Sequence, residues 1–241
     1  MRLLAKLKEK LRFGTLGLTC DCCGTEIFRY PQLRLCEDCE KELWRNDGLY
    51  CEKCGRASPA QGLCLVCKRQ PPHFEKAASP IVYFDNGAEI LNRFKEGRRY
   101  LVGFLAEEMC AVIARLELPA PPVLVAVPTT EEKRMARGYS PPELLAKEIA
   151  SRTGYRFAEE VLVKVRNNEQ KKRSAQERLE EIRGTIRVKK RKFCEGKVIL
   201  LIDDVMTTGA TGSECARVLK NAGATAVYFL TACAVVQKRV T

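Results

Sequence analysis

VILLIDDVMTTGAT, residues 198–211, is the most informative stretch of this 241-residue sequence. Its first five residues form an uninterrupted apolar run, which is typical of a parallel strand that is covered on both faces. Residues 211–221 are predicted to form a helix, because the periodic pattern stops at Ala222-Gly223. Ligands of open α/β sheets bind beyond the carboxyl ends of the strands, so we expect the functional chemistry directly after Ile202.

The same alternation of strands and helices continues around this stretch. Short apolar runs predict strands, and apolar residues at helical spacing predict helices. The sequence therefore predicts an α/β fold, a parallel sheet with helices on both faces. The predicted strands are 81–84, 123–127, 161–163 and 227–230, and the predicted helices are 90–94 and 101–113, which break near Gly97, and one opened by Ser140-Pro141-Pro142-Glu143.

The polar residues after Ile202 favour a ligand that combines a diol with a phosphate. Adjacent carboxylates such as Asp203 and Asp204 can accept hydrogen bonds from two neighbouring hydroxyl groups. Hydroxyls and a flexible turn at a helix N-terminus can donate to a phosphate, and this stretch supplies Thr207, Thr208, Gly209 and Thr211. Groups for a diol, followed within a few residues by groups for a phosphate, match the two ends of a ribose 5-phosphate. A surface turn with acidic helix caps is the alternative, but it explains only one of the two aspartates.

The N-terminal part of the chain is rich in cysteine. Nine of the 13 cysteines lie between Cys20 and Cys67, and eight of these form two repeats of paired C-x2-C turns. Two such turns facing each other provide four sulfurs in a tetrahedron, which suits Zn²⁺ in a closed structural site. We predict two structural zinc sites, the first made by Cys20, Cys23, Cys36 and Cys39 and the second by Cys51, Cys54, Cys64 and Cys67.

Two other uses of these cysteines remain open, a disulfide scaffold and an iron–sulfur cluster. Residues 1–12 interleave leucines with basic residues and contain no apolar core of a secretory signal, so we expect a cytoplasmic protein with reduced thiols. This disfavours disulfides. Cys22 is surplus to both repeats and is expected to be a free thiol. His73 is the only histidine, which nearly excludes histidine ligands and histidine-based catalytic triads.

The charge of the chain is as uneven as its cysteine content. The formal net charge is +12, and residues 164–192 carry eight of these positive charges. Hydrophobic residues make up 46% of the chain, enough for a sizeable core, but no run of about 18 uncharged apolar residues predicts a membrane-spanning helix. Within the basic block, residues 187–192 form a separate cluster that is either a solvated hairpin or a contact for a polyanion.

Residues 198–211 resemble the motif that binds 5-phosphoribosyl 1-pyrophosphate (PRPP) in type I phosphoribosyltransferases. The whole chain resembles the ComF/GntX (ComFC-like) family of competence proteins, in which a double zinc ribbon precedes a phosphoribosyltransferase domain. Phe94-Lys95-Glu96-Gly97, Val127-Pro128, Arg137-Gly138-Tyr139 and residues 174–184 also match. The chain departs from the family at Ser140-Pro141, where the family usually has Asn-Gln, and at Glu181, where asparagine is common. These departures flank the expected acceptor side.

The resemblance implies a role for each matching residue. Asp203 and Asp204 would bind the ribose hydroxyls, and Thr207, Thr208, Gly209 and Thr211 the 5-phosphate. Lys95 and the turn at Pro128 would also contact PRPP, the turn through its pyrophosphate. Mg²⁺ would bind mainly to pyrophosphate and ribose oxygens. A mobile catalytic loop with Lys171, Lys172 and Arg173 would neutralise the departing pyrophosphate.

The resemblance also implies the organisation and the function of the chain. Residues 1–16 would be an amphipathic segment, residues 17–72 a double zinc ribbon, and residues 76–241 the phosphoribosyltransferase-like domain. The implied function is PRPP binding with Mg²⁺ in a cytoplasmic protein of DNA uptake, natural transformation and single-stranded DNA handling. An active phosphoribosyltransferase of nucleotide or amine metabolism is one alternative, and a non-catalytic regulatory protein is another. Single-stranded DNA, a DNA-uptake helicase and other competence proteins are the candidate partners, and peripheral attachment to the inner membrane is the alternative location.

Overall fold

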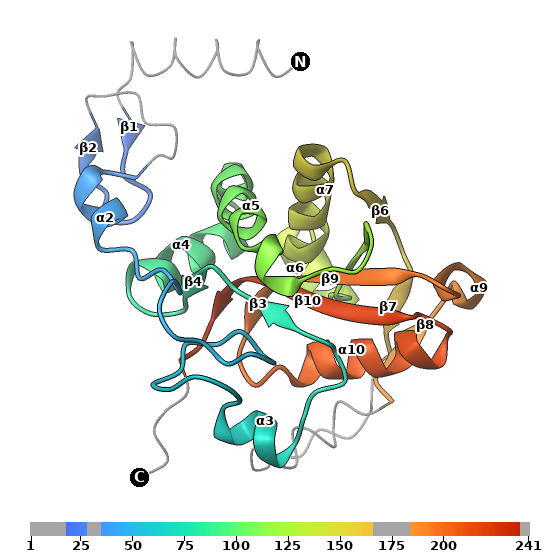
Figure 1. Cartoon of the computed structure of the whole chain (residues 1–241). Helices are drawn as coiled ribbons and strands as arrows, with labels where there is room; N and C mark the ends of the chain where they lie inside the picture. Colours follow the sequence, from blue (N-terminus) through green and yellow to red (C-terminus); the bar gives the residue numbers. More distant parts are fainter. Residues whose placement is uncertain (1–17, 28–34, 166–183, 237–241) are drawn as a thin grey trace, which may run out of the picture.

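Two long strands, β9 (Val198–Met206) and β10 (Ala226–Ala234), form the centre of a parallel sheet (Figure 1). The computed structural model describes residues 18–27, 35–165 and 184–236. The strand order is β3–β10–β9–β5–β6, and β4 also pairs with β10. The shorter strands are β3 (Ala77–Ala78), β4 (Ile81–Val82), β5 (Val123–Ala126) and β6 (Arg156–Ala158).

The apolar run of β9 is buried on both of its faces. Successive side chains of a strand point to opposite faces. Leu200 and Ile202 accordingly join one hydrophobic cluster, whereas Ile199 and Leu201 join a second cluster on the other face. All four side chains are fully buried. This confirms the prediction of a parallel sheet that is covered on both sides.

Helices supply the two layers that cover the sheet (Figure 1). The first hydrophobic cluster is completed by α4 (Asn86–Lys95), α5 (Val102–Ala111) and α7 (Pro141–Thr153), and the second by α10 (Ala210–Asn221). Short helical segments connect them: η1 (Arg99–Leu101), η2 (Ile113–Leu116), α6 (Glu131–Arg137) and α9 (Arg191–Cys194). The predicted break near Gly97 is present, because α4 ends at Lys95 and α5 begins at Val102.

Several elements differ from the sequence prediction. β9 was expected to end at Ile202 but runs on to Met206, because β10 continues to pair with it as far as Ala234. A strand does form near residues 161–163, as β7 (Leu162–Lys164), but it pairs with β8 (Ile186–Val188) in a separate antiparallel sheet. The strand expected over 81–84 is shorter, and β6 and α6 were not predicted.

The cysteine-rich part packs against both layers of the fold. It contains β1 (Leu18–Thr19), β2 (Glu26–Ile27), α2 (Glu37–Lys41) and α3 (Leu65–Arg69). Cys20 and Cys39 of the first repeat belong to the cluster that includes α4 and α5, whereas all four cysteines of the second repeat belong to the cluster of α10. The expected amphipathic segment, residues 1–16, lies outside the described residues. Across the described ranges, no helix combines the length and apolarity that a membrane crossing requires.

Candidate functional site

Asp204 and Lys95 form an ion pair at the carboxyl end of β9. Asp204 is only 8% exposed, and its Oδ1 lies 3.3 Å from Nζ of Lys95 at the end of α4. The two residues were predicted from separate motifs that lie more than 100 positions apart, and the structure brings them together. Tertiary packing of α4 on this face of the sheet produces the pair.

Asp203 faces the opposite side of the sheet, as expected for the residue preceding Asp204 in an extended strand. Its Oδ1 accepts a hydrogen bond from the backbone N–H of Asp204 at 2.9 Å. Burial, followed by the neighbouring Asp204 carboxylate, raises the pKa of Asp203 to about 8, although Lys95 and Lys164 partly oppose this rise. The two carboxylates therefore have different environments, one paired with a lysine and one that tends to keep its proton.

The loop 207–209 connects these carboxylates to α10. Thr207 and Thr208 are exposed, and Gly209 has a φ of 80°, a conformation that favours glycine. Within the described part of the chain, no protein group accepts a hydrogen bond from the backbone N–H of Thr208 or Gly209, and Thr208 Oγ1 accepts one from Ala210 N–H. Thr211 lies in the first turn of α10. Free N–H donors at a helix N-terminus suit an anion such as phosphate.

The turn at Pro128 emerges at the same edge of the sheet. β5 and β9 run parallel with Ala126 opposite Ile202, and the backbone N–H of Val127 donates to the carbonyl of Ile202 at 2.9 Å. Pro128 therefore leaves the sheet beside the aspartate pair. Thr129 Oγ1 lies 3.0 Å from Ser140 Oγ, which ties this turn to the start of α7.

Two of the shorter sequence matches pack against each other beside Lys95. The hydroxyl of Tyr139 donates a hydrogen bond to the backbone carbonyl of Phe94, and the two rings meet edge to face with centroids 6.1 Å apart. The Arg99 guanidinium lies 4.5 Å from the centroid of the Tyr139 ring. These contacts fix the C-terminal end of α4, which carries Lys95, against the segment before α7.

Two neighbours of the site were not predicted from the sequence, Lys164 and Arg56. Lys164, in β7, acts electrostatically on Asp203. Arg56 is 6% exposed, and its Nη1 donates to the backbone carbonyl of Thr207 at 2.9 Å. Arg56 and Thr207 are separated by 151 positions, so no local pattern could have linked them.

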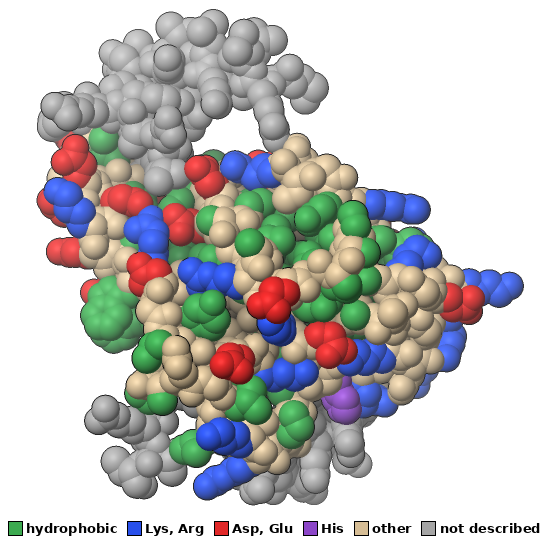
Figure 2. Space-filling model, viewed as in Figure 1, with side chains coloured by type: hydrophobic (Ala, Val, Ile, Leu, Met, Phe, Trp, Pro, Cys, Tyr) green, Lys and Arg blue, Asp and Glu red, His purple; other side chains and the backbone are tan. Residues whose placement is uncertain are grey.

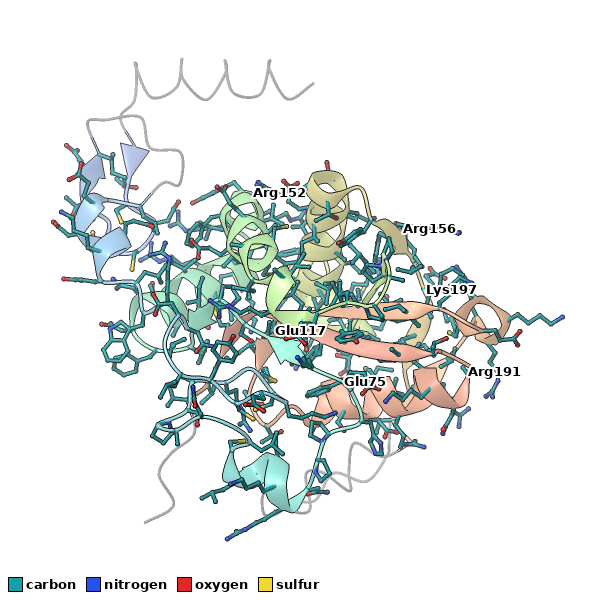
Figure 3. The ribbon with its side chains drawn as sticks, viewed as in Figure 1. Glu75, Glu117, Arg152, Arg156, Arg191 and Lys197 are labelled. Carbon is teal, nitrogen blue, oxygen red and sulfur yellow. The ribbon has the colours of Figure 1, made fainter. Side chains whose placement is uncertain are left out.

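Several residues that were predicted near the site are not among the described residues. Lys171, Lys172, Arg173 and Glu181 lie outside the described residues. The cluster 187–192 is described. It begins in β8, beside the strand β7 that carries Lys164, and ends in α9, and Figure 3 labels Arg191 and Lys197 at this end of the sheet. Arg191 contacts the carbonyl of Asn221 at the C-terminal end of α10, about 18 Å along this helix from the loop 207–209.

The basic residues of this cluster have partners within the chain. Lys189 Nζ lies 3.6 Å from Glu160 Oε2. Lys190 Nζ donates to the carbonyl of Glu159 at 2.8 Å, and Arg191 Nη2 donates to that of Asn221 at 3.0 Å. The contact with a polyanion remains a prediction.

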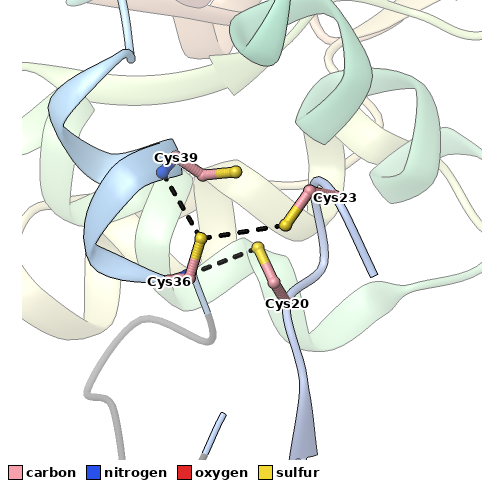
Figure 4. Close-up of side chains that lie close together, drawn as sticks. All are labelled: Cys20, Cys23, Cys36 and Cys39. Carbon is pink, nitrogen blue, oxygen red and sulfur yellow. Dashed lines mark hydrogen bonds between the residues drawn. The ribbon is translucent and has the colours of Figure 1, made fainter. Parts of the chain in front are cut away.

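The first cysteine group brings its four sulfurs together (Figure 4). Its ligand atoms all lie within 4.8 Å of one another, and the sulfurs of Cys23 and Cys36 are 3.8 Å apart. The backbone N–H of Cys36 donates to Cys20 Sγ at 3.3 Å, and that of Cys39 donates to Cys36 Sγ at 3.4 Å. A tetrahedral zinc ion with Zn–S bonds of about 2.3 Å would place its sulfurs about 3.8 Å apart. The group fits zinc.

The second cysteine group has the same geometry and is fully buried. Cys54 Sγ and Cys64 Sγ are 3.8 Å apart, and the backbone N–H of Cys64 donates to Cys51 Sγ at 3.3 Å. All 13 cysteines are free in the structure. Each of the two groups could hold a zinc ion. Cys22 belongs to neither group: its Sγ donates to Asn86 Oδ1 at 3.0 Å, and burial raises its pKa to about 11.

The matched family agrees with the geometry of the site. Residues 143–240 match the family described as phosphoribosyl transferase domain. The aspartate pair, the loop 207–209 and α10 all lie within the matched range, whereas Lys95 and Pro128 precede it.

The relatives extend over most of the chain. Competence protein ComFC of Bacillus subtilis is 29% identical over 200 residues, which cover 80% of this chain and 80% of that protein. DNA utilization protein YhgH of Salmonella typhi is 26% identical and covers 83% and 89%, and competence protein F of Haemophilus influenzae is 24% identical and covers 78% and 85%. The resemblance expected from the motifs, a cysteine-rich part followed by a phosphoribosyl transferase domain, is confirmed.

Proposed function

We propose that the protein binds PRPP together with Mg²⁺ at residues 203–211 and acts in the uptake and use of DNA. The observation that carries the first part is the set of free N–H donors in the loop 207–209, directly beside the aspartate pair, within the range that matches the phosphoribosyl transferase domain. The second part rests on relatives named for competence and for DNA utilization.

In this proposal each part of PRPP has its own contacts. Asp204, beside Lys95, accepts hydrogen bonds from the ribose hydroxyls, and Asp203 accepts the N–H of Asp204 and positions it. The loop 207–209 with Thr211 holds the 5-phosphate. The turn at Pro128 and the ammonium of Lys95 lie on the pyrophosphate side. Mg²⁺ supplies positive charge to the pyrophosphate oxygens and is held mainly by ligand oxygens and water. The cysteine groups each hold a structural zinc ion, which keeps the N-terminal part folded.

The presence of a phosphoribosyl transferase domain favours turnover as a second candidate function. A nucleophile would form a bond to C1 of the ribose while the bond from C1 to the pyrophosphate oxygen breaks, and pyrophosphate leaves with both bonding electrons. The protein would contribute positioning and charge stabilisation, with Lys171, Lys172 and Arg173 near the leaving group. An assay of PRPP-dependent pyrophosphate release, across bases, amines and single-stranded DNA, tests this. Pyrophosphate release with any acceptor supports an enzyme. Absence of release with every acceptor supports a binding protein.

A complementation experiment tests whether the site serves DNA uptake. In a naturally transformable host that lacks its own ComFC-type protein, the wild-type gene should restore transformation. The Asp203→Asn/Asp204→Asn variant should leave transformation at the level of the deletion, because the ribose contacts are lost. Glu159→Gln, which removes an exposed carboxylate that pairs with Lys147 and makes no described contact with the loop, is the matched control and should restore it. Full restoration by the aspartate variant, at equal protein level, would contradict the proposal.

A further inference from the structure

Arg56 joins the second cysteine group to the loop that is proposed to bind phosphate. Its Nε donates to Cys54 Sγ at 3.3 Å, and its Nη1 donates to the carbonyl of Thr207 at 2.9 Å. The side chain is 6% exposed, so both bonds form in a largely water-excluded setting. The planar guanidinium of Arg56 therefore contacts Cys54, a candidate metal ligand, on one side and the loop 207–209 on the other.

The bond to Thr207 fixes the direction of a donor that the ligand needs. The carbonyl of Thr207 and the N–H of Thr208 belong to one planar trans peptide and point in opposite directions. Holding the carbonyl toward Arg56 therefore turns the N–H of Thr208 to the opposite side of the loop. This N–H is one of the two donors that no described protein group uses. Arg56 thus orients a free donor without facing the ligand itself.

The cysteine turn that carries Arg56 is locked against the sheet. Gly55 has a φ of 65°, and a Cβ at this position would lie 2.2 Å from the carbonyl oxygen of Ala77 in β3. Asn46 Nδ2 donates to the carbonyls of Gly55 and Ser79, at 2.6 and 3.0 Å. These contacts hold the backbone of the turn close to β3, and the side chain of Arg56 is in turn held by its bond to Cys54, so the orientation of the guanidinium depends on how Cys54 is fixed.

We infer that Arg56 couples metal binding in the second cysteine group to ligand binding in the loop 207–209. The inference rests on the proposed function. With metal bound, Cys54 is fixed and Arg56 holds the Thr207 carbonyl; without metal, the turn loses its anchor and the loop loses its orientation. Because such coupling is reciprocal, a ligand in the loop also raises the affinity of the second group for metal, and we expect the tighter binding to appear as slower metal loss. Arg56 is a positioning residue in this scheme.

The test uses the zinc-loaded full chain and follows zinc release to a coloured chelator, with and without PRPP and Mg²⁺. In the wild type, PRPP should slow release from the second group about tenfold, within the range of coupled sites, and leave the first group unchanged. Arg56→Gln should keep two zinc ions, bind PRPP about tenfold more weakly and lose the protection. Arg56→Lys should recover part of the affinity, because an ammonium can reach one of the two acceptors.

Arg45→Gln is the matched control. Arg45 also joins a cysteine segment to the sheet domain, through Glu40 of α2 and Glu108 of α5, but it does not contact the loop. This variant should retain both the affinity and the protection. If the wild type binds PRPP but releases zinc equally fast with and without it, the inference is wrong, whether or not Arg56→Gln folds. If the wild type does not bind PRPP at all, the proposed function fails instead.

Discussion

Asp203 and Asp204 are neighbours in the sequence but have different chemical environments. Asp204 is paired with Lys95, whereas burial raises the pKa of Asp203 from 3.8 to about 8. The folded protein therefore keeps a proton on Asp203 that the unfolded chain releases above about pH 4. The native state binds more protons in this window, so Asp203 makes the free energy of unfolding fall as pH rises from about 4 to about 8.

Asp203→Asn should remove this pH dependence. The variant carries no charge to bury, so its free energy of unfolding should exceed that of the wild type most at pH 8.5 and least at pH 5. Urea unfolding of both proteins across this range measures the difference. Parallel curves for the two proteins would contradict the assignment of a buried, proton-retaining Asp203.

Gly212 sets how closely α10 approaches the sheet. A Cβ here would lie 2.4 Å from Cε1 of Phe229 in β10. Gly212→Ala should therefore reduce the free energy of unfolding by about 1–3 kcal/mol through overpacking, despite the better helix propensity of alanine. Gly103→Ala in α5 is the matched control: its Cβ meets only Arg152 Nη2 at 3.6 Å, and it should stabilise by about 0.5–1 kcal/mol. Equal effects of the two changes would contradict the close packing.

At the scale of elements, the sequence predicts the helices and strands that a local periodic pattern of apolar residues specifies. β9 and α10 were found because an apolar run and a helical pattern flank the polar residues of the site. The end of β9 was missed, since it depends on continued pairing with β10 beyond Asp203. β7 was found as a strand, but its partner β8 was not, because the choice between two sheets depends on tertiary contacts. A local pattern cannot predict where a strand ends when that end is set by pairing with another strand.

Metal analysis should find about two zinc ions per chain, and iron with visible absorbance would contradict the zinc prediction.

The two cysteine groups should differ in how much of the fold depends on them. The second group packs in the cluster of β9 and α10, whereas Cys23 of the first group is exposed. Cys51→Ser should therefore lower the thermal midpoint more than Cys23→Ser. A larger loss for Cys23→Ser would contradict this packing argument.

At the scale of the whole molecule, the positive charge is divided between distant places. On the face shown in Figure 2, basic side chains are interspersed with acidic ones and do not form one continuous patch. In the cluster with Lys189, Lys190 and Arg191, Arg191 contacts the C-terminal end of α10, whereas the proposed ligand loop precedes the N-terminal end of this helix. Net charge alone therefore does not indicate one binding surface.

Reversing the charge at Lys189, Lys190 and Arg191 tests whether DNA and PRPP bind to different surfaces. Binding of single-stranded DNA should weaken and lose part of its salt dependence, because fewer phosphates are neutralised. PRPP affinity should stay within about twofold, since Arg191 lies about 18 Å from the loop along α10 and Lys189 and Lys190 contact Glu160 and Glu159 rather than the loop. Fluorescence anisotropy at several salt concentrations and calorimetry measure the two effects. An unchanged salt slope would assign these residues to solvent.

The long-range contacts of the site were the least predictable part of the molecule. The spacing of the cysteines predicted the two cysteine groups, the polar residues after an apolar run predicted the aspartate pair, and the family resemblance pointed to Lys95 and Pro128. It could not show that the cysteine groups pack on opposite faces of the sheet, or that Arg56 reaches Thr207. Both depend on how segments far apart in the chain pack together.

Calorimetric titration of PRPP with Mg²⁺ into the zinc-loaded protein is the most direct measurement of the proposed site. The wild type should bind one PRPP per chain. Asp203→Asn/Asp204→Asn should lose at least tenfold in affinity while unfolding cooperatively, since a hydrogen bond to the Asp204 carboxylate, which is paired with Lys95, contributes about 1.5–3 kcal/mol. Absence of binding by the wild type, or equal affinity in the double variant, would contradict a PRPP site at residues 203–211.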